Sequence, residues 1–148
     1  MLSIIGSFVI SLLLLPYWPG GSNKFSAEPT YPHSIPVIDT LGVQVGKAIK
    51  EWNACGSVQL HKGPQSLAET PGTITILDGL DELPRGGWTG DHGVLFLPAG
   101  SWTRSIPVIR HELGHALGFG HTKLWRIMGG SNHVQRRDCN GLVRYYGR

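Results

Sequence analysis

The stretch HELGHALGFGH, which begins at His111, constrains the fold more than any other part of this sequence. His111 and His115 are four residues apart, so a helix would place both imidazoles on one face. Glu112 would then lie about 100° further round the same helix. Gly118 accepts backbone angles that other residues resist, so the chain can leave the helix there and return His121 toward the other histidines. The stretch therefore predicts a helix that carries His111 and His115 and ends at Gly118, with His121 returning toward them after the turn.

These side chains are the donors that a catalytic zinc ion uses. Three neutral imidazoles leave a fourth coordination position open, whereas a structural zinc site normally has four protein ligands and favours thiolates. We therefore predict that His111, His115 and His121 bind Zn²⁺ and that Glu112 is the base for a metal-held water. The alternative is a buried helix whose histidines make ordinary hydrogen bonds, but this reading has also to explain the glycine break.

The flanking sequence predicts a sheet covered by helices. Apolar alternation and β-branched residues predict strands at 35–39, 57–61, 73–77 and 94–97. Apolar residues at helical spacing predict helices at 41–55 and at 136–147. Cap candidates at Thr103 and Ser105, Pro107 just inside the helix and the break at Gly118 predict a further helix that runs to about Leu117. Gln44, Lys47, Lys50 and Glu51 should face away from the core on the first of these helices. Asp138 is the cap candidate of the last helix, and the glycine-rich residues 84–93 are expected to form a loop.

The N-terminus carries an apolar run at residues 2–15, which suits a signal peptide and is short for a membrane-spanning helix. We predict that residues 1–27 are a signal peptide, or an anchor if they are retained, and that 28–34 are a short arm before one domain at 35–148. The protein should then be secreted, or membrane-anchored if the segment stays. The net charge is only +3 and the C-terminal arginines form no block, so we expect no nucleic-acid partner.

The sequence contains two cysteines, Cys55 and Cys139. In an exported protein an even number of cysteines favours a disulfide, and two cysteines permit one pairing. This bond would close a loop of more than 80 residues. Two buried free thiols are the alternative if the chain stays in the cytosol.

Taken together, these features resemble the metzincins, a clan of zinc endopeptidases with the motif HExxHxxGxxH and a following methionine turn. HELGHALGFGH matches every fixed position, and Met128 lies seven residues beyond His121, where the methionine of the turn is expected. The order of segments over 35–148 resembles small, matrixin-like members. The resemblance implies an α+β zincin-like fold with a twisted, mixed sheet of four to five strands and an antiparallel edge strand. An N-terminal helix and the active-site helix would pack on this sheet, and a C-terminal helix would follow.

The resemblance also implies a function and residue roles. The zinc ligands would be His111, His115 and His121, the general base Glu112, and the hydrophobic floor beneath the metal Met128. Gly93–Pro98 matches the antiparallel edge strand that lines the cleft, so a peptide would dock along it by strand addition. We expect a monomeric zinc endopeptidase that hydrolyses peptide bonds with a metal-activated water.

Two other functions remain open from the sequence. One is a zinc-containing domain that binds peptides without cleaving them, and the other is a zinc hydrolase of a non-protein or cell-wall substrate. Two features depart from the matrixin pattern. Gly129 and Gly130 replace the Tyr-Pro pair usual after the methionine, and no cysteine-switch motif is visible, so we expect no latency by that route.

Overall fold

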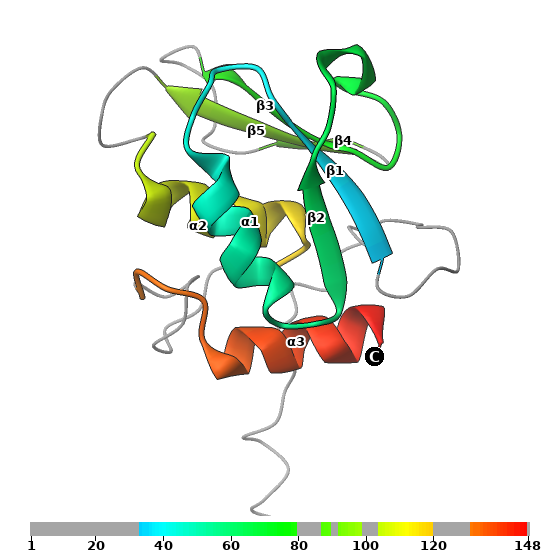
Figure 1. The fold of residues 1–148 in the computed structure, drawn as a ribbon, viewed down its shortest axis with the longest axis vertical. Coiled ribbons are helices and arrows are strands. Elements are labelled where there is room, and N and C mark those ends of the chain that lie inside the picture. The colour runs from blue at the N-terminus through cyan, green and yellow to red at the C-terminus, as the bar shows by residue number, and fades with distance from the viewer. Residues whose placement is uncertain (1–32, 80–86, 90–91, 99–103, 120–130, 148) are drawn as a thin grey trace, which may run out of the picture.

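The computed structural model describes residues 33–79, 87–89, 92–98, 104–119 and 131–147 (Figure 1). Its elements are β1 (His33–Asp39), α1 (Val45–Asn53), β2 (Val58–Lys62), the 3₁₀ turn η2 (Gln65–Leu67), β3 (Ile74–Gly79), β4 (Gly87–Thr89), β5 (His92–Pro98), α2 (Ile106–Ala116) and α3 (Arg136–Tyr146). The expected α+β class is confirmed. None of the helices in the described part of the chain is long and apolar enough to span a membrane. The predicted signal peptide at 1–27 lies outside the described residues.

The five strands form one sheet in the order β2-β1-β3-β5-β4. The strands β2, β1, β3 and β5 run parallel to one another, whereas β4 pairs antiparallel with β5. The prediction that Gly93–Pro98 is the antiparallel edge strand is therefore wrong, because β5 runs parallel to β3 and β4 occupies the edge. The sequence predicts a loop where β4 lies, because Gly87 and Gly90 flank Trp88 and Thr89 and glycine is depleted in strands.

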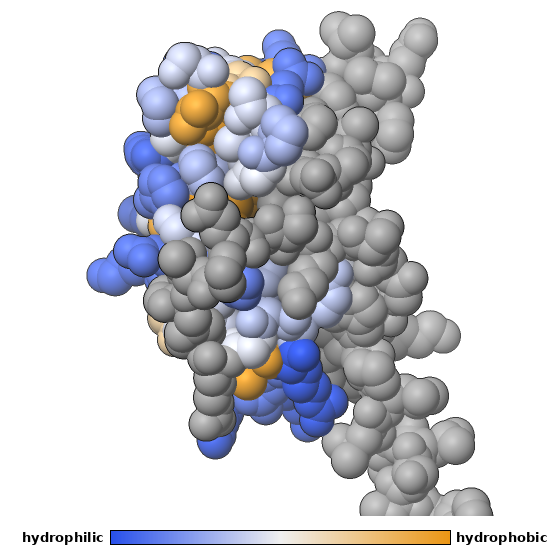
Figure 2. All heavy atoms as spheres, turned by 90° about the vertical axis from the view of Figure 1, so that its right-hand side faces the viewer, coloured by the Kyte–Doolittle hydropathy of each residue, from blue (hydrophilic) through white to orange (hydrophobic). Residues whose placement is uncertain are grey.

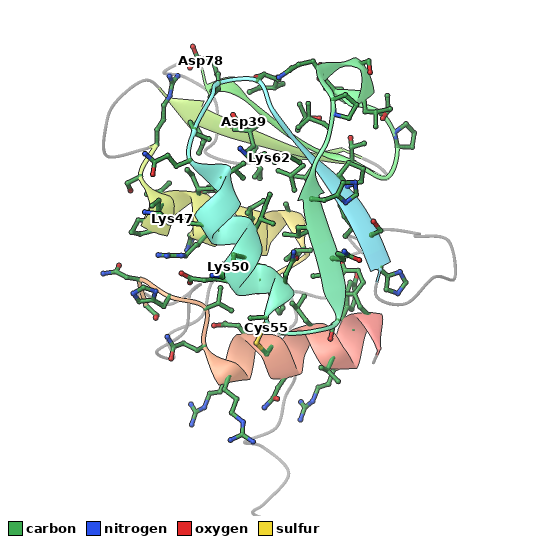
Figure 3. The ribbon with its side chains drawn as sticks, in the orientation of Figure 1. Asp39, Lys47, Lys50, Cys55, Lys62 and Asp78 are labelled. Carbon is green, nitrogen blue, oxygen red and sulfur yellow. A yellow bond between two sulfur atoms is a disulfide. The ribbon has the colours of Figure 1, made fainter. Side chains whose placement is uncertain are left out.

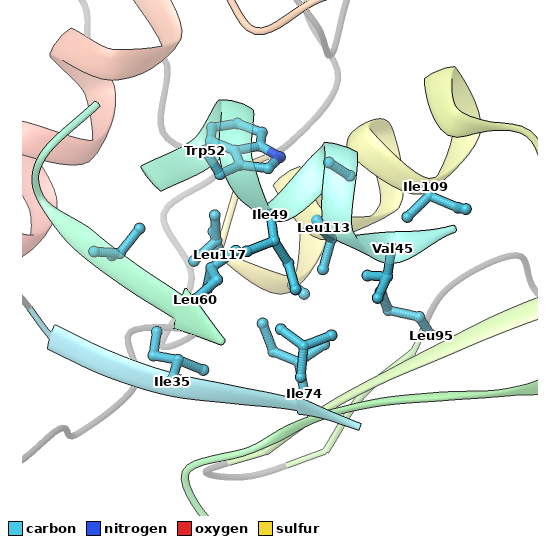
Figure 4. Packing of buried hydrophobic residues seen from close by; sticks show 14 of the residues in the cluster. Ile35, Val45, Ile49, Trp52, Leu60, Ile74, Leu95, Ile109, Leu113 and Leu117 are labelled. Atoms are coloured by element: carbon cyan, nitrogen blue, oxygen red, sulfur yellow. The ribbon is translucent and has the colours of Figure 1, made fainter. Parts of the chain in front are cut away.

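Helices α1 and α2 pack side by side on one face of the sheet and enclose the core with it (Figures 1 and 4). Every side chain of this core is at most 8% exposed. Its largest contributors are Val45, Ile49 and Trp52 from α1, Ile109 and Leu113 from α2, and Ile35, Leu60, Ile74 and Leu95 from the strands. The apolar residues whose spacing predicted α1 are thus the residues that α1 buries.

The opposite face of the sheet is covered by the connection between β2 and β3, which contains η2. The backbone of Gly63 lies so close to Ile38 that a Cβ there would come within 2.5 Å of Ile38 Cδ1. Glu69 N donates a hydrogen bond to Thr75 Oγ1 at 2.8 Å. Figure 2 shows hydrophobic residues only in small areas among polar ones on the described part of one side of the molecule. Leu67, at 38%, is the one large hydrophobic residue exposed among those described.

α1 begins later than expected, at Val45 rather than at residue 41. The carboxylate of Asp39 (labelled in Figure 3) accepts hydrogen bonds from the backbone N–H groups of Leu41 and Val43, both at 3.1 Å. These bonds hold the chain in a loop before the helix, because a side-chain acceptor competes with the helical hydrogen bonds. Both residues still pack against the core, and Leu41 was for this reason included in the apolar spacing that predicted the helix.

α3 is joined to the end of α1 by the disulfide Cys55–Cys139, so the predicted pairing is confirmed and the free-thiol alternative is wrong (Figure 3). Asp138 takes part in the cap of α3, as expected, but not at the N-cap position itself. Gln135 occupies that position, and Asp138 is the third helical residue of a capping box. Its Oδ2 accepts a hydrogen bond from Gln135 N at 2.7 Å.

Candidate metal centre

The helix α2 carries two of the predicted zinc ligands and the predicted base. Ser105 takes the N-cap position and a proline lies in the first turn, where its missing N–H is of no consequence. Ile109 and Leu113 are 0% exposed and fix the helix against the core. His111 and His115 are only half-buried, so they lie on a different side of the helix from these apolar residues.

The two histidine rings lie next to each other. The ring centroids of His111 and His115 are 4.8 Å apart, and their planes are nearly perpendicular at 87°. Two imidazoles that bind one zinc ion at about 2.0–2.1 Å in tetrahedral geometry bring their centroids to roughly 5 Å apart. The observed spacing therefore fits two ligands of the same ion.

The imidazole of His115 is also held in the tautomer that a metal requires. Its Nδ1 lies 2.7 Å from the carbonyl oxygen of Phe119. A carbonyl oxygen only accepts hydrogen bonds, so Nδ1 carries the proton, and in the neutral ring Nε2 keeps its lone pair. Metal-binding histidines usually donate their second nitrogen in this manner.

The end of α2 turns sharply, as the sequence predicts. Gly118 has a φ of 99°, in the left-handed region that glycine tolerates. Gly118 N donates to His115 O at 2.8 Å, and Phe119 N donates to Gly114 O at 2.9 Å. These two bonds form a Schellman motif, which redirects the chain immediately before His121.

Glu112 is 7% exposed and follows the first of the two histidines directly. A general base has to lie within hydrogen-bond distance of the proton that it accepts. The carboxylate of Glu112, next to His111 in the chain, therefore fits the role of base for a water on a metal that the two histidines bind. The two imidazoles of α2 thus fit zinc ligands, and the carboxylate beside them fits a base for metal-held water.

The other predicted site residues are not in the described part of the chain. His121 and Met128 lie between 120 and 130, as do Gly129 and Gly130, so the third ligand and the methionine floor stay predictions. Among the residues that the structure describes, no group of three or more His, Cys, Asp and Glu side chains is arranged to hold a metal.

Sequence reasoning missed an ion pair that braces α2. Arg110 has an 8% exposed side chain, and its Nη2 pairs with Glu51, which was expected to face away from the core. Arg110 Nη1 donates to Asn132 O at 2.6 Å, and Glu51 Oε2 accepts from Val134 N at 3.4 Å. The pair therefore ties α1 and α2 to the segment that follows residues 120–130. A single sequence offers no signal that could pair two charges 59 residues apart.

No protein-family profile matches the sequence, and no curated protein matches it significantly. A solved structure with a similar fold is that of high choriolytic enzyme 1, a hatching enzyme zinc-protease from the medaka fish Oryzias latipes. The two chains are 19% identical with a TM-score of 0.50, and the match covers 68% of this chain and 50% of the fish enzyme. The chain thus corresponds to half the length of that enzyme. The similarity supports a metzincin-like fold and does not distinguish the matrixin-like members.

Proposed function

We propose that this protein is a zinc-dependent endopeptidase. The observation that carries the proposal is the state of His115. Its Nδ1 donates to Phe119 O, which leaves its Nε2 lone pair for a metal, and its ring lies 4.8 Å from that of His111, so both rings can bind one ion. The alternative of a helix with ordinary, satisfied histidines gives no reason for this arrangement beside a buried glutamate.

The proposed roles follow the chemistry of each group. His111 and His115 hold the metal together with His121. A bound zinc ion supplies a Lewis acid that polarises a carbonyl group and lowers the pKa of water. Glu112 accepts the proton of the attacking water and delivers it to the leaving amine. The Schellman turn at Gly118 ends α2 three residues before the proposed third ligand, His121, in the sequence.

We place the peptide substrate along β4, because β4 rather than β5 is the antiparallel strand at the edge of the sheet. An edge strand offers backbone N–H and C=O groups to which an extended peptide can add as a further strand. We also propose that the protein is a secreted monomer. The disulfide favours an oxidising compartment.

The test compares two isosteric substitutions in the full chain, Glu112→Gln and Glu69→Gln. Both remove one negative charge, but the first lies in the candidate centre and the second is exposed on the far side of the sheet. We expect the first variant to bind zinc as the wild type does and to lose about 10²–10⁴-fold in cleavage of casein. The second should cleave casein normally. Full activity of Glu112→Gln would refute the mechanism.

A chelator separates the proposal from the two other functions. Casein cleavage that stops on chelation and returns with zinc supports a zinc protease. Zinc and peptide binding without cleavage would favour the binding domain. Release of soluble fragments from cell-wall material, with intact casein, would favour the non-protein hydrolase.

A further inference from the structure

We propose that Trp52 is a positioning residue of the metal centre. It contacts the chain directly before and directly after the segment that carries His111, Glu112 and His115. The inference rests on the proposed function, since it concerns how the same two imidazoles are held for zinc.

The first contact is at the start of the segment. The indole Nε1–H of Trp52 donates a hydrogen bond to the backbone oxygen of Arg110 at 3.0 Å, in a buried environment. Arg110 is the residue immediately before His111. The bond therefore fixes the rotation and height of α2 at the position from which the first ligand projects. A buried tryptophan usually places its N–H on such a partner.

The second contact is at the end of the segment. The ring of Trp52 stacks on the ring of Phe119, with centroids 5.6 Å apart and an interplanar angle of 15°. Phe119 is the residue whose carbonyl accepts the proton of His115 Nδ1. Phe119 is 2% exposed, so its ring is enclosed by packed neighbours. The stack thus holds the acceptor that orients the second ligand.

Trp52 is itself on a fixed support. It is 0% exposed and labelled at the top of the core in Figure 4. The next residue, Asn53, makes two hydrogen bonds with the backbone of Leu60 in β2, from Nδ2 to Leu60 O at 2.9 Å and from Leu60 N to Oδ1 at 2.7 Å. Cys55 then joins the end of α1 to α3. The sheet and α3 therefore serve as the reference against which the ligands are aligned.

The two possible roles of Trp52, filling the core or positioning the ligands, predict different effects of its replacement. If it only fills the core, its replacement lowers the free energy of unfolding and leaves the zinc affinity of the folded protein unchanged. If it positions the ligands, zinc affinity falls by more than the loss of stability explains. Removal of partners that orient metal ligands typically weakens metal binding by about 10–100-fold.

The experiment uses three variants of the full chain. Trp52→Phe removes the N–H donor but keeps an aromatic ring, and Phe119→Leu removes the stack but keeps the backbone carbonyl. Ile38→Val is the control, because Ile38 is 0% exposed but lies on the opposite face of the sheet, against Gly63. For each variant we would measure the zinc dissociation constant, the unfolding free energy, and the ¹⁵N chemical shifts of the His115 imidazole in metal-free protein.

We expect Trp52→Phe and Phe119→Leu each to bind zinc about tenfold more weakly than the wild type. The His115 shifts should move toward a mixture of tautomers in both variants. Ile38→Val should lose stability without either change. Zinc affinities within twofold of the wild type in both aromatic variants would overturn this inference but not the proposed function. A wild-type protein that binds no zinc would overturn the proposed function and this inference with it.

Discussion

The disulfide between Cys55 and Cys139 should contribute a large part of the stability of this domain. The two cysteines are 84 residues apart, and closing a loop of that length in the unfolded chain corresponds to about 4.6 kcal/mol in the chain-entropy relation. Small domains are stable by only about 5–15 kcal/mol in total. We therefore expect the double substitution Cys55→Ser/Cys139→Ser to lower the free energy of unfolding by about 3–5 kcal/mol. Both cysteines are half-buried, so the serine hydroxyls keep some access to water.

Urea unfolding followed by circular dichroism measures this loss. With a slope of about 1–3 kcal/mol per molar urea, the midpoint should fall by roughly 1–5 M. Each single substitution should cost as much as the double one, because either removes the bond. Chemical reduction of the wild type serves as an independent control and should give the same loss. A double variant within about 1 kcal/mol of the oxidised wild type would refute the entropic argument.

Four further substitutions test local features. Gly118→Ala places a side chain at a φ of 99° and should lower the free energy of unfolding by about 1–2 kcal/mol, as measured by thermal unfolding. It should also weaken zinc binding, as measured by metal titration. Gly63→Ala forces a Cβ to within 2.5 Å of Ile38 Cδ1 and should cost about 1–3 kcal/mol by urea unfolding. Gly46→Ala is its matched control, because the nearest atom to the new Cβ is a lysine carbon at 3.9 Å, and it should gain about 0.5 kcal/mol in the same assay. Glu51→Gln removes the charge that pairs with a buried guanidinium and should cost about 2–4 kcal/mol; an unchanged melting temperature would contradict the brace.

The elements that depend on local periodicity were predicted well. β1 and β3 follow the alternation of apolar residues, although β1 begins at His33, inside the segment expected as an arm. α2 ends where Gly118 allows the chain to turn, and α3 contains the residues whose apolar spacing predicted it. In each case neighbouring residues determine which backbone conformation buries the apolar side chains, so the sequence carries the information locally.

Several features were predicted wrongly, and the following ones depend on a partner distant in sequence or on a competing hydrogen bond. β4 is a strand because β5 pairs with its backbone, whereas the glycines around Trp88 and Thr89 favoured a loop from the sequence alone. The first turn assigned to α1 is a loop because Asp39 takes its N–H groups. Glu51 faces Arg110 rather than solvent because α2 packs beside α1.

For the candidate site, the sequence by itself determined the donor set. The spacing of His111, Glu112 and His115 places them on one helix, and Gly118 ends it. Only the tertiary structure decided how these groups are held. Phe119 O fixes the proton on His115 Nδ1, and Trp52, from the preceding helix α1, packs on the ring of Phe119. The reason is physical: spacing within a helix follows from its own geometry, whereas the orientation of a side chain depends on atoms that folding brings from elsewhere.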